Sequence, residues 1–507
     1  MSRPALTERQ RSSLLTVFAS VIPNIFIMIF GALKTRAMIS CLGSEVNGAY
    51  QIMVQLTSFV AFTNLGLDTA FRVNYYRMLA ADDREKVSAV YRYSIRFFRR
   101  ITMIMLGVAG IISLAALIFV SDVFLKWQVI LIQFLLCMPS VTYFMIGNEV
   151  ALADARQKGY IYIFWHNLAY LARLVLTLYI IYHYKNLLAA LIADAFISTS
   201  TNWMIGRYLK KSNSVLIDSE KTEDSSPVNY SRYVIAYRLA SLVFYNTDNI
   251  VLALFFSKTK ISIYAAYIYI ANCLVAMTSY LTSSFTNAVG NLLHSHETYK
   301  EAVVNELFWL VSYILLICCI PLAAGMERFV SGIWIGKPDY IVNPLLYFMI
   351  VMYFALDGYM KIVEMMENSS ALYQYTYKIN LAEAVSNIVF SVLLVYLIGM
   401  NGIILATLMS MSIANIIKLK VIFRHLDMDY RHIRIRYVQF IVMAAAEIGI
   451  AMYCSRWYAG ASMLRWIGLE LAAGILSVVL NTGLLCGLFP EFRRIIVKYW
   501  HKFVRTA

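Results

Sequence analysis

The sequence predicts an all-α membrane protein that crosses the bilayer about fourteen times. Of its 507 residues, 60% are apolar and only 14% are charged, whereas soluble domains contain roughly 45–50% apolar and about 25% charged residues. One membrane span needs about 20 mostly apolar residues. Fourteen segments meet this requirement: 13–33, 46–70, 101–120, 128–150, 161–182, 187–206, 233–256, 261–285, 304–325, 341–363, 379–398, 402–422, 438–455 and 463–488.

The connectors between these segments alternate in length and in charge. If both termini lie in the cytoplasm, the inner segments carry 32 of the 44 Lys and Arg residues and the outer segments carry 10. The positive-inside rule therefore predicts a multi-pass protein with both termini in the cytoplasm. The net charge of +15 then reflects topology and contact with anionic membrane lipids, and no nucleic acid is expected as a partner.

One polar, proline-containing connector in the middle of the chain divides the predicted spans into groups. We expect an N-terminal six-helix bundle at 1–211, a cytoplasmic linker at 212–231 and a C-terminal six-helix bundle at 232–425. Two additional spans follow at 426–488, and a basic amphipathic cytoplasmic tail follows at 489–507. Because six is an even number, the two bundles run in the same direction and are predicted to be pseudo-symmetric about the membrane normal.

The first predicted span contains a helix breaker and an amide, and two cations follow at its outer end. Pro23 predicts a bend and a hinge, and Asn24 can satisfy a backbone group that the bend frees. Lys34 and Arg36 follow at the outer end of the span. One interpretation is an ordinary proline kink with snorkelling cations; the other is a bent helix that lines a cavity.

Ionisable residues also occur inside later spans, where they are costly and face protein or water by default. Arg173 lies near the middle of its span, too deep to snorkel easily, and Asp194 lies in the next span. Arg238 and Asp248 share the seventh predicted span, ten residues apart, which is about 15 Å along a helix. Arg238 is within snorkelling range of the inner surface, whereas Asp248 is expected to face a cavity.

Motifs of soluble enzymes and metal sites are absent from the sequence. It contains no Walker A motif, no Gly-x-Gly-x-x-Gly turn and no Cys-x-x-Cys. The seven cysteines are odd in number, lie mostly in apolar runs and indicate buried thiols with neither disulfides nor a metal site. We therefore expect no enzyme activity and no cofactor, and a secondary transporter is favoured over an ATP-driven one.

Several short motifs resemble those of a known family. They are Lys34–Arg36, Leu42–Tyr50, Asn64–Ala70, Asn74–Arg77, Asp154–Ile161 and Asn246–Asp248. Together with the 6 + 6 + 2 arrangement of spans, they are similar to the bacterial polysaccharide flippases. These translocases of O-antigen and capsule repeat units are related to multidrug exporters of the MATE type and to the lipid II flippase.

This resemblance implies that the chain flips an oligosaccharide linked to a polyprenyl diphosphate from the inner to the outer leaflet of the bacterial cytoplasmic membrane. The diphosphate requires cations in a low-dielectric cavity. The candidates are Lys34, Arg36, Arg173 and Arg238. Asn24 and Asn246 are candidates for binding sugar hydroxyls, and Asp248 and then Asp194 are candidates for coupling to H⁺ or Na⁺.

Two other functions remain open at the level of sequence. A MATE-type drug antiporter shares the expected fold, but organic cations require an acidic cavity, whereas the best candidates here are mostly basic. A membrane glycan polymerase or acyltransferase commonly carries a large outer loop or a catalytic histidine. A flippase would have lipid-linked oligosaccharide and anionic lipids as partners, with polysaccharide polymerases or glycosyltransferases as further candidates.

Overall fold

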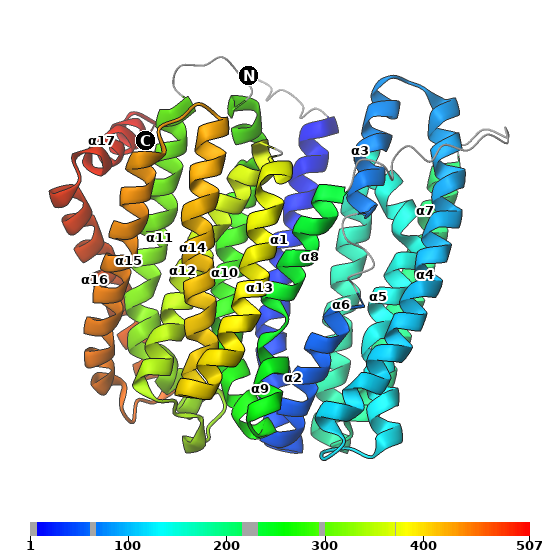
Figure 1. The fold of residues 1–507 in the computed structure, drawn as a ribbon, viewed down its shortest axis with the longest axis horizontal. Coiled ribbons are helices and arrows are strands. Elements are labelled where there is room, and N and C mark those ends of the chain that lie inside the picture. Colours follow the sequence, from blue (N-terminus) through cyan, green and yellow to red (C-terminus); the bar gives the residue numbers. More distant parts are fainter. Residues whose placement is uncertain (1–7, 61–66, 215–231, 294–299, 371, 507) are drawn as a thin grey trace. The chain divides into compact units, whose positions relative to one another are not determined.

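The computed structural model describes residues 8–60, 67–214, 232–293, 300–370 and 372–506. The chain divides into two compact units, Met1–Ser262 and Ile263–Ala507. All regular elements among the described residues are helices (Figure 1). The prediction of an all-α polytopic membrane protein is thereby confirmed. The predicted linker at 212–231 lies largely outside the described residues, and the predicted bundle boundaries stay predictions.

The first unit contains ten complete helices among its described residues, and an eleventh, α10, begins in it. They are α1 (Glu8–Ala37), a short π-helix η1 (Met38–Leu42), α2 (Ser44–Ser58), α3 (Leu67–Ala80), α4 (Arg84–Val120), α5 (Lys126–Ala155), α6 (Gly159–Tyr184), α7 (Leu187–Asn213), α8 (Arg232–Tyr245), α9 (Asp248–Phe255) and α10 (Lys258–Leu293).

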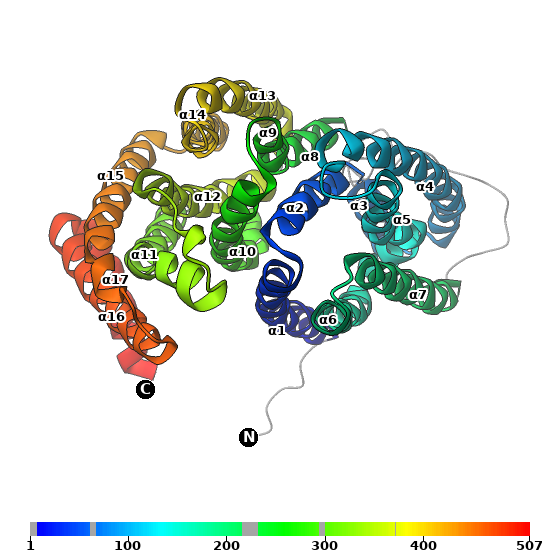
Figure 2. The same cartoon turned by 90° about the horizontal axis from the view of Figure 1, so that it is seen from below.

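The second unit is built around one buried helix. Its elements are α11 (Lys300–Arg328), η5 (Phe329–Trp334), η6 (Pro338–Tyr340), α12 (Pro344–Ser370), α13 (Tyr373–Ile398), α14 (Asn401–His425), α15 (Tyr430–Cys454), η7 (Ser455–Tyr458), α16 (Met463–Leu488) and α17 (Pro490–Thr506). In the most apolar 18-residue stretch of α12, 89% of the residues are buried, and α11, α14 and α15 pack against this helix (Figure 2). Polar side chains on α12 are therefore enclosed by protein.

Twelve helices of the described chain are long and apolar enough to cross a membrane in one piece. The two further spans that the sequence predicts are present as broken helices. The described residues of the segment predicted at 46–70 contain most of α2 and the first residues of α3, and the segment predicted at 233–256 contains α8 and α9 (Figure 1). Turns at Phe59–Val60 and Asn246–Thr247 interrupt these two predicted spans, so neither is a single continuous helix.

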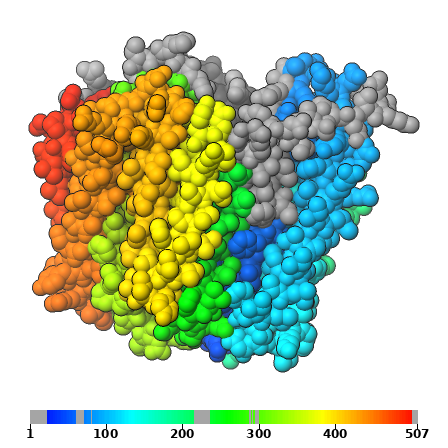
Figure 3. All heavy atoms as spheres, viewed as in Figure 1, coloured from blue at the N-terminus to red at the C-terminus, as the bar shows by residue number. Residues whose placement is uncertain are grey.

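The exposed surface of the helices matches a lipid environment. On α4, Met103, Ile111 and Ile118 are 65%, 68% and 78% exposed and lie on one face of the helix. Figure 3 shows α4 at the surface of its unit. A contiguous apolar face of this kind is unusual in water. It is expected where hydrocarbon chains surround a helix, so this multi-pass chain is a membrane protein.

A close backbone contact fixes α2 against the start of α10. Asn47 Nδ2 donates to Ser262 Oγ over 2.7 Å. A Cβ atom added at Gly48 would lie 1.8 Å from the carbonyl oxygen of Lys258. Gly48 is therefore required by space, because only a residue without a side chain allows the two backbones to approach this closely.

We expect Gly48→Ala to lower the free energy of unfolding by about 1–3 kcal/mol or more, because the backbone must move to admit the methyl group. The apparent melting temperature of the purified protein in detergent measures this. Gly107→Ala on α4 is the matched control, since its Cβ would meet no atom within 4 Å. Equal melting temperatures of the two variants would contradict the close contact.

Candidate functional site

A polar cluster in the first unit joins four helices, α1, α2, α6 and α7. Arg173 on α6 is buried, and its Nε and Nη2 donate to Asp194 Oδ1 and Oδ2 over 2.9 and 2.6 Å. This is a bidentate ion pair, the geometry that a guanidinium and a carboxylate favour. The short connection between Tyr184 and Leu187 makes α6 and α7 antiparallel neighbours, which places the two side chains at similar depth.

Lys34 on α1 supplies a second cation to this cluster. Its Nζ donates to the hydroxyl of Tyr50 on α2 over 2.7 Å and lies 4.8 Å from the centroid of the same ring. The ammonium group also interacts electrostatically with Asp194 and Tyr170. Lys34, Arg173 and Asp194 together carry one net positive charge. The cluster therefore attracts an anion, although Asp194 already occupies one edge of the Arg173 guanidinium.

The structure brings together three of the predicted site residues, Lys34, Arg173 and Asp194. Among the residues that the structure describes, no hydrogen bond or ion pair connects Arg36 or Arg238 to them. Both of these arginines are exposed, Arg36 near the end of α1 and Arg238 on α8. Their predicted roles in substrate binding stay predictions.

The predicted hinge residue lies in a continuous helix. The helix α1 runs from Glu8 to Ala37 through Pro23, so the proline does not end it. Asn24 is half-buried on the same helix. A bend at Pro23 and a sugar contact of Asn24 remain expectations.

The break between α8 and α9 contains two other predicted residues. Asn246 Nδ2 donates to the carbonyl of Leu242 over 2.9 Å and so satisfies a backbone group at the end of α8. Asp248 is the first residue of α9, where the helix dipole favours a negative charge. Gln55 of α2 accepts the backbone N–H of Asn249 over 2.8 Å. Broken helices of this kind form ion and substrate sites in many transporters.

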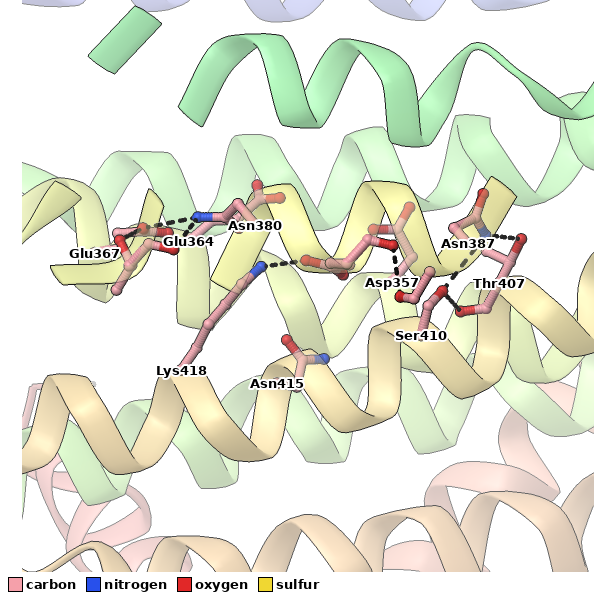
Figure 4. A network of polar contacts seen from close by, with 12 residues as sticks. Asp357, Glu364, Glu367, Asn380, Asn387, Thr407, Ser410, Asn415 and Lys418 are labelled. Atoms are coloured by element: carbon pink, nitrogen blue, oxygen red, sulfur yellow. Dashed lines mark hydrogen bonds and ion pairs between the residues drawn. The ribbon is translucent and has the colours of Figure 1, made fainter. Parts of the chain in front are cut away.

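A second polar network lies inside the second unit, between α12, α13 and α14 (Figure 4). Lys418 Nζ of α14 donates to Glu383 Oε2 of α13 over 2.7 Å, and the two side chains are 1% and 3% exposed. A charged pair this deeply buried must be matched closely, because each ion has lost its water.

The network continues along α12. Lys361 Nζ lies 3.1 Å from Asp357 Oδ1 and 3.3 Å from Glu364 Oε1. The hydroxyl of Tyr353 also lies 3.1 Å from Asp357 Oδ2. Asp357 is 2% exposed. One lysine thus stands between two carboxylates on successive turns of the same helix.

The end of the network beside the connection between α12 and α13 is acidic and amide-rich. Glu367 of α12 accepts from Thr376, and its Oε1 accepts from Asn380 Nδ2 over 3.3 Å. Glu367 Oε2 and Glu383 Oε1 are buried and have no hydrogen-bond partner among the residues that the structure describes. The network as a whole contains four carboxylates and two ammonium groups. It therefore has capacity for added protons or cations.

Sequence reasoning missed the functional potential of Lys361 and Lys418. The positive-inside count places both on inner connectors, whereas Lys418 is buried in α14 and Lys361 is partly buried in α12, with its side chain 11% exposed. The available signal was the apolar sequence that continues past Lys418 to Phe423. Glu149 was missed as well, and it accepts hydrogen bonds from Tyr91 over 2.6 Å and from Asn213 over 2.8 Å in the first unit.

No family model and no curated protein matches the sequence. Solved structures match the fold. The lipid II flippase MurJ in an inward closed conformation aligns with a TM-score of 0.65 and 12% identity, covering 93% of this chain and 98% of MurJ. The Vibrio cholerae MATE transporter VcmN in the bent form aligns with a TM-score of 0.56 and 13% identity, covering 82% of this chain and 98% of VcmN.

An outward-facing multidrug resistance MATE transporter of the MOP superfamily aligns equally well, with a TM-score of 0.56 and 13% identity. It covers 83% of this chain and 99% of its own. The fold that the sequence motifs led us to expect is thus confirmed. The chain has the fold shared by the lipid II flippase and the MATE transporters of the MOP superfamily.

Proposed function

We propose that this protein is a secondary transporter that flips polyprenyl-diphosphate-linked oligosaccharide repeat units from the inner to the outer leaflet of the bacterial cytoplasmic membrane. The observation that supports this most directly is the net positive cluster of Lys34, Arg173 and Asp194 within membrane-spanning helices. A cation within a membrane-spanning helix costs free energy unless an anion or a polar group interacts with it. A diphosphate is a partner of matching charge.

Transport would be coupled to protons through competition between Asp194 and the substrate phosphate for the Arg173 guanidinium. When Asp194 is ionised, it occupies the guanidinium through both of its oxygens. Protonation of Asp194 weakens this pair and frees donors of Arg173 for a phosphate. Proton binding and anion binding are then linked, because each depends on the same carboxylate. Asp248 at the broken helix and the carboxylate surplus of α12–α14 are further candidates for coupling.

The MATE-type drug antiporter is the second candidate function, and the acidic network of α12–α14 is the observation in its favour. Organic cations bind carboxylates that they can reach. In this network Asp357, Glu367 and Glu383 are 2%, 0% and 5% exposed. The enclosed position of these groups favours a coupling or structural role over drug binding.

Depletion of the protein tests the proposed function directly. We expect a lipid-linked oligosaccharide to accumulate on the inner leaflet as surface polysaccharide falls, because the intermediate is made but not moved. Mass spectrometry of the extracted lipids identifies it. Depletion that raises no polyprenyl-linked glycan, or that instead sensitises cells to organic cations, would overturn the flippase proposal.

Lys34→Ala tests the role of the cluster. The charged hydrogen bonds of an ammonium are worth about 1.5–3 kcal/mol, so we expect surface polysaccharide export to fall about tenfold or more at matched protein levels. Lys126→Ala is the control, since Lys126 is an exposed cation at the start of α5. Normal export by the Lys34 variant would remove this residue from substrate binding.

A further inference from the structure

A long apolar groove runs along the first unit between α6 and α7, which lie side by side in Figure 2. Its volume is about 790 Å³, which is within the range of ligand sites. One wall is formed by Ile161, Trp165, Leu168 and Ala172 of α6, and the other by Ile197, Thr201, Met204 and Tyr208 of α7. Both sets recur at helical spacing, so each wall is one face of its helix.

The groove has the length of one membrane leaflet. From Ile161 to Ala172 the helix rises by about 17 Å, and half of the hydrocarbon core is about 15 Å. Small residues, Ala169, Ala172 and Thr201, lie among larger ones. A single hydrocarbon chain that lies along the helices would therefore be in contact with both walls over the depth of a leaflet.

Two lysines lie near one end of the groove, and the other end lies near the Arg173–Asp194 ion pair. Lys211 follows Tyr208 by three residues on the groove face of α7, and Lys158 lies three residues before Ile161, immediately before α6 begins. Both lysines are exposed. At the deep end, Ala172 immediately precedes Arg173, and Ile197 lies one turn after Asp194. The groove thus has exposed lysines near one end, and at the other end its lining residues lie within one turn of Arg173 and Asp194.

We propose that this groove is the loading site for the lipid carrier, in which the prenyl chain lies between α6 and α7 and the diphosphate binds between Lys158 and Lys211. The proposal rests on the flippase function and on the orientation with basic connectors inside. Two ammonium groups match a diphosphate, which carries more than one negative charge. A single groove matches one chain, whereas a phospholipid has one phosphate and two chains.

A photocrosslinking experiment tests the site in the full-length protein in phosphatidylcholine nanodiscs. A benzophenone amino acid replaces Met204, which lies in the groove and is 64% exposed, or Trp203, which does not line the groove and is 57% exposed. With undecaprenyl diphosphate as the probe, we expect several-fold more adduct at Met204 than at Trp203. We also expect Lys158→Gln/Lys211→Gln to reduce the adduct at Met204 by about tenfold.

Each contrary result has a separate meaning. Equal adducts at the two positions would overturn the groove as a binding site. Displacement of the probe by an equimolar amount of phosphatidylglycerol would show a general phospholipid site and overturn the carrier assignment. Absence of the Met204 adduct from a protein whose depletion still accumulates lipid-linked glycan would refute the groove and leave the function intact. A strong adduct without such accumulation would support carrier binding and refute flipping.

Discussion

Lys418→Met is expected to lower the free energy of unfolding by about 3–5 kcal/mol, because it leaves Glu383 as a buried carboxylate without a cation. The two side chains are almost fully enclosed, and the donor and acceptor atoms are 2.7 Å apart. Thermal unfolding of the purified protein in detergent measures the loss.

A double variant separates charge from packing. In Lys418→Met/Glu383→Gln no charge is left unpaired, so most of the stability should return. Lys420→Met is the control, because Lys420 lies two residues away on the same helix and is exposed. If the single Lys418 variant melted like the Lys420 variant, the pair would contribute little. If the double variant were as unstable as the single one, packing of the lysine stem would be the cause.

Arg173→Met is expected both to destabilise the protein by about 3–5 kcal/mol and to abolish export. The first effect follows because Asp194 loses its bidentate partner in a membrane-spanning helix. The second follows from the proposed function, since the guanidinium is the planar donor available to a phosphate in this cluster. Melting temperature and surface polysaccharide at matched protein levels are the two measurements.

The double variant Arg173→Met/Asp194→Asn distinguishes these two effects. It removes both charges, so the melting temperature should recover towards that of the native protein, while export should remain lost. Recovery of export together with stability would show that the pair has only a structural role. Arg173→Lys should retain a charge but lose one of the two parallel hydrogen bonds, so partial export is expected.

The sequence predicts twelve of the spans as single helices in their correct order, because the length of an apolar run is a direct consequence of membrane thickness. It did not predict the interruption at Asn246–Thr247. The signal was present, since Asn, Thr and Asp side chains compete for backbone hydrogen bonds and favour turns and caps. The sequence pattern predicts site residues within a span, whereas in the structure these residues lie where α8 ends and α9 begins.

The pairing of Arg173 with Asp194 was only partly predictable. Both residues were identified as costly in a membrane, but they were assigned to substrate binding and to ion coupling separately. Their distances from the turn between α6 and α7, twelve and eight residues, could have indicated a shared depth. The contact of Lys34 with Tyr50 was not predictable in this way, because it depends on how α1 and α2 pack against each other.

The burial of Lys418 also affects how the protein reaches the membrane. Insertion of a single lysine or glutamate at the centre of a span costs about 2.5–3.5 kcal/mol. The helices α13 and α14 are connected by only Gly399 and Met400 and are in close contact along their length. If Glu383 and Lys418 pair before they leave the insertion machinery, the two helices enter the lipid with these two charges already compensated. Biogenesis of this region would then require both helices to be synthesised first.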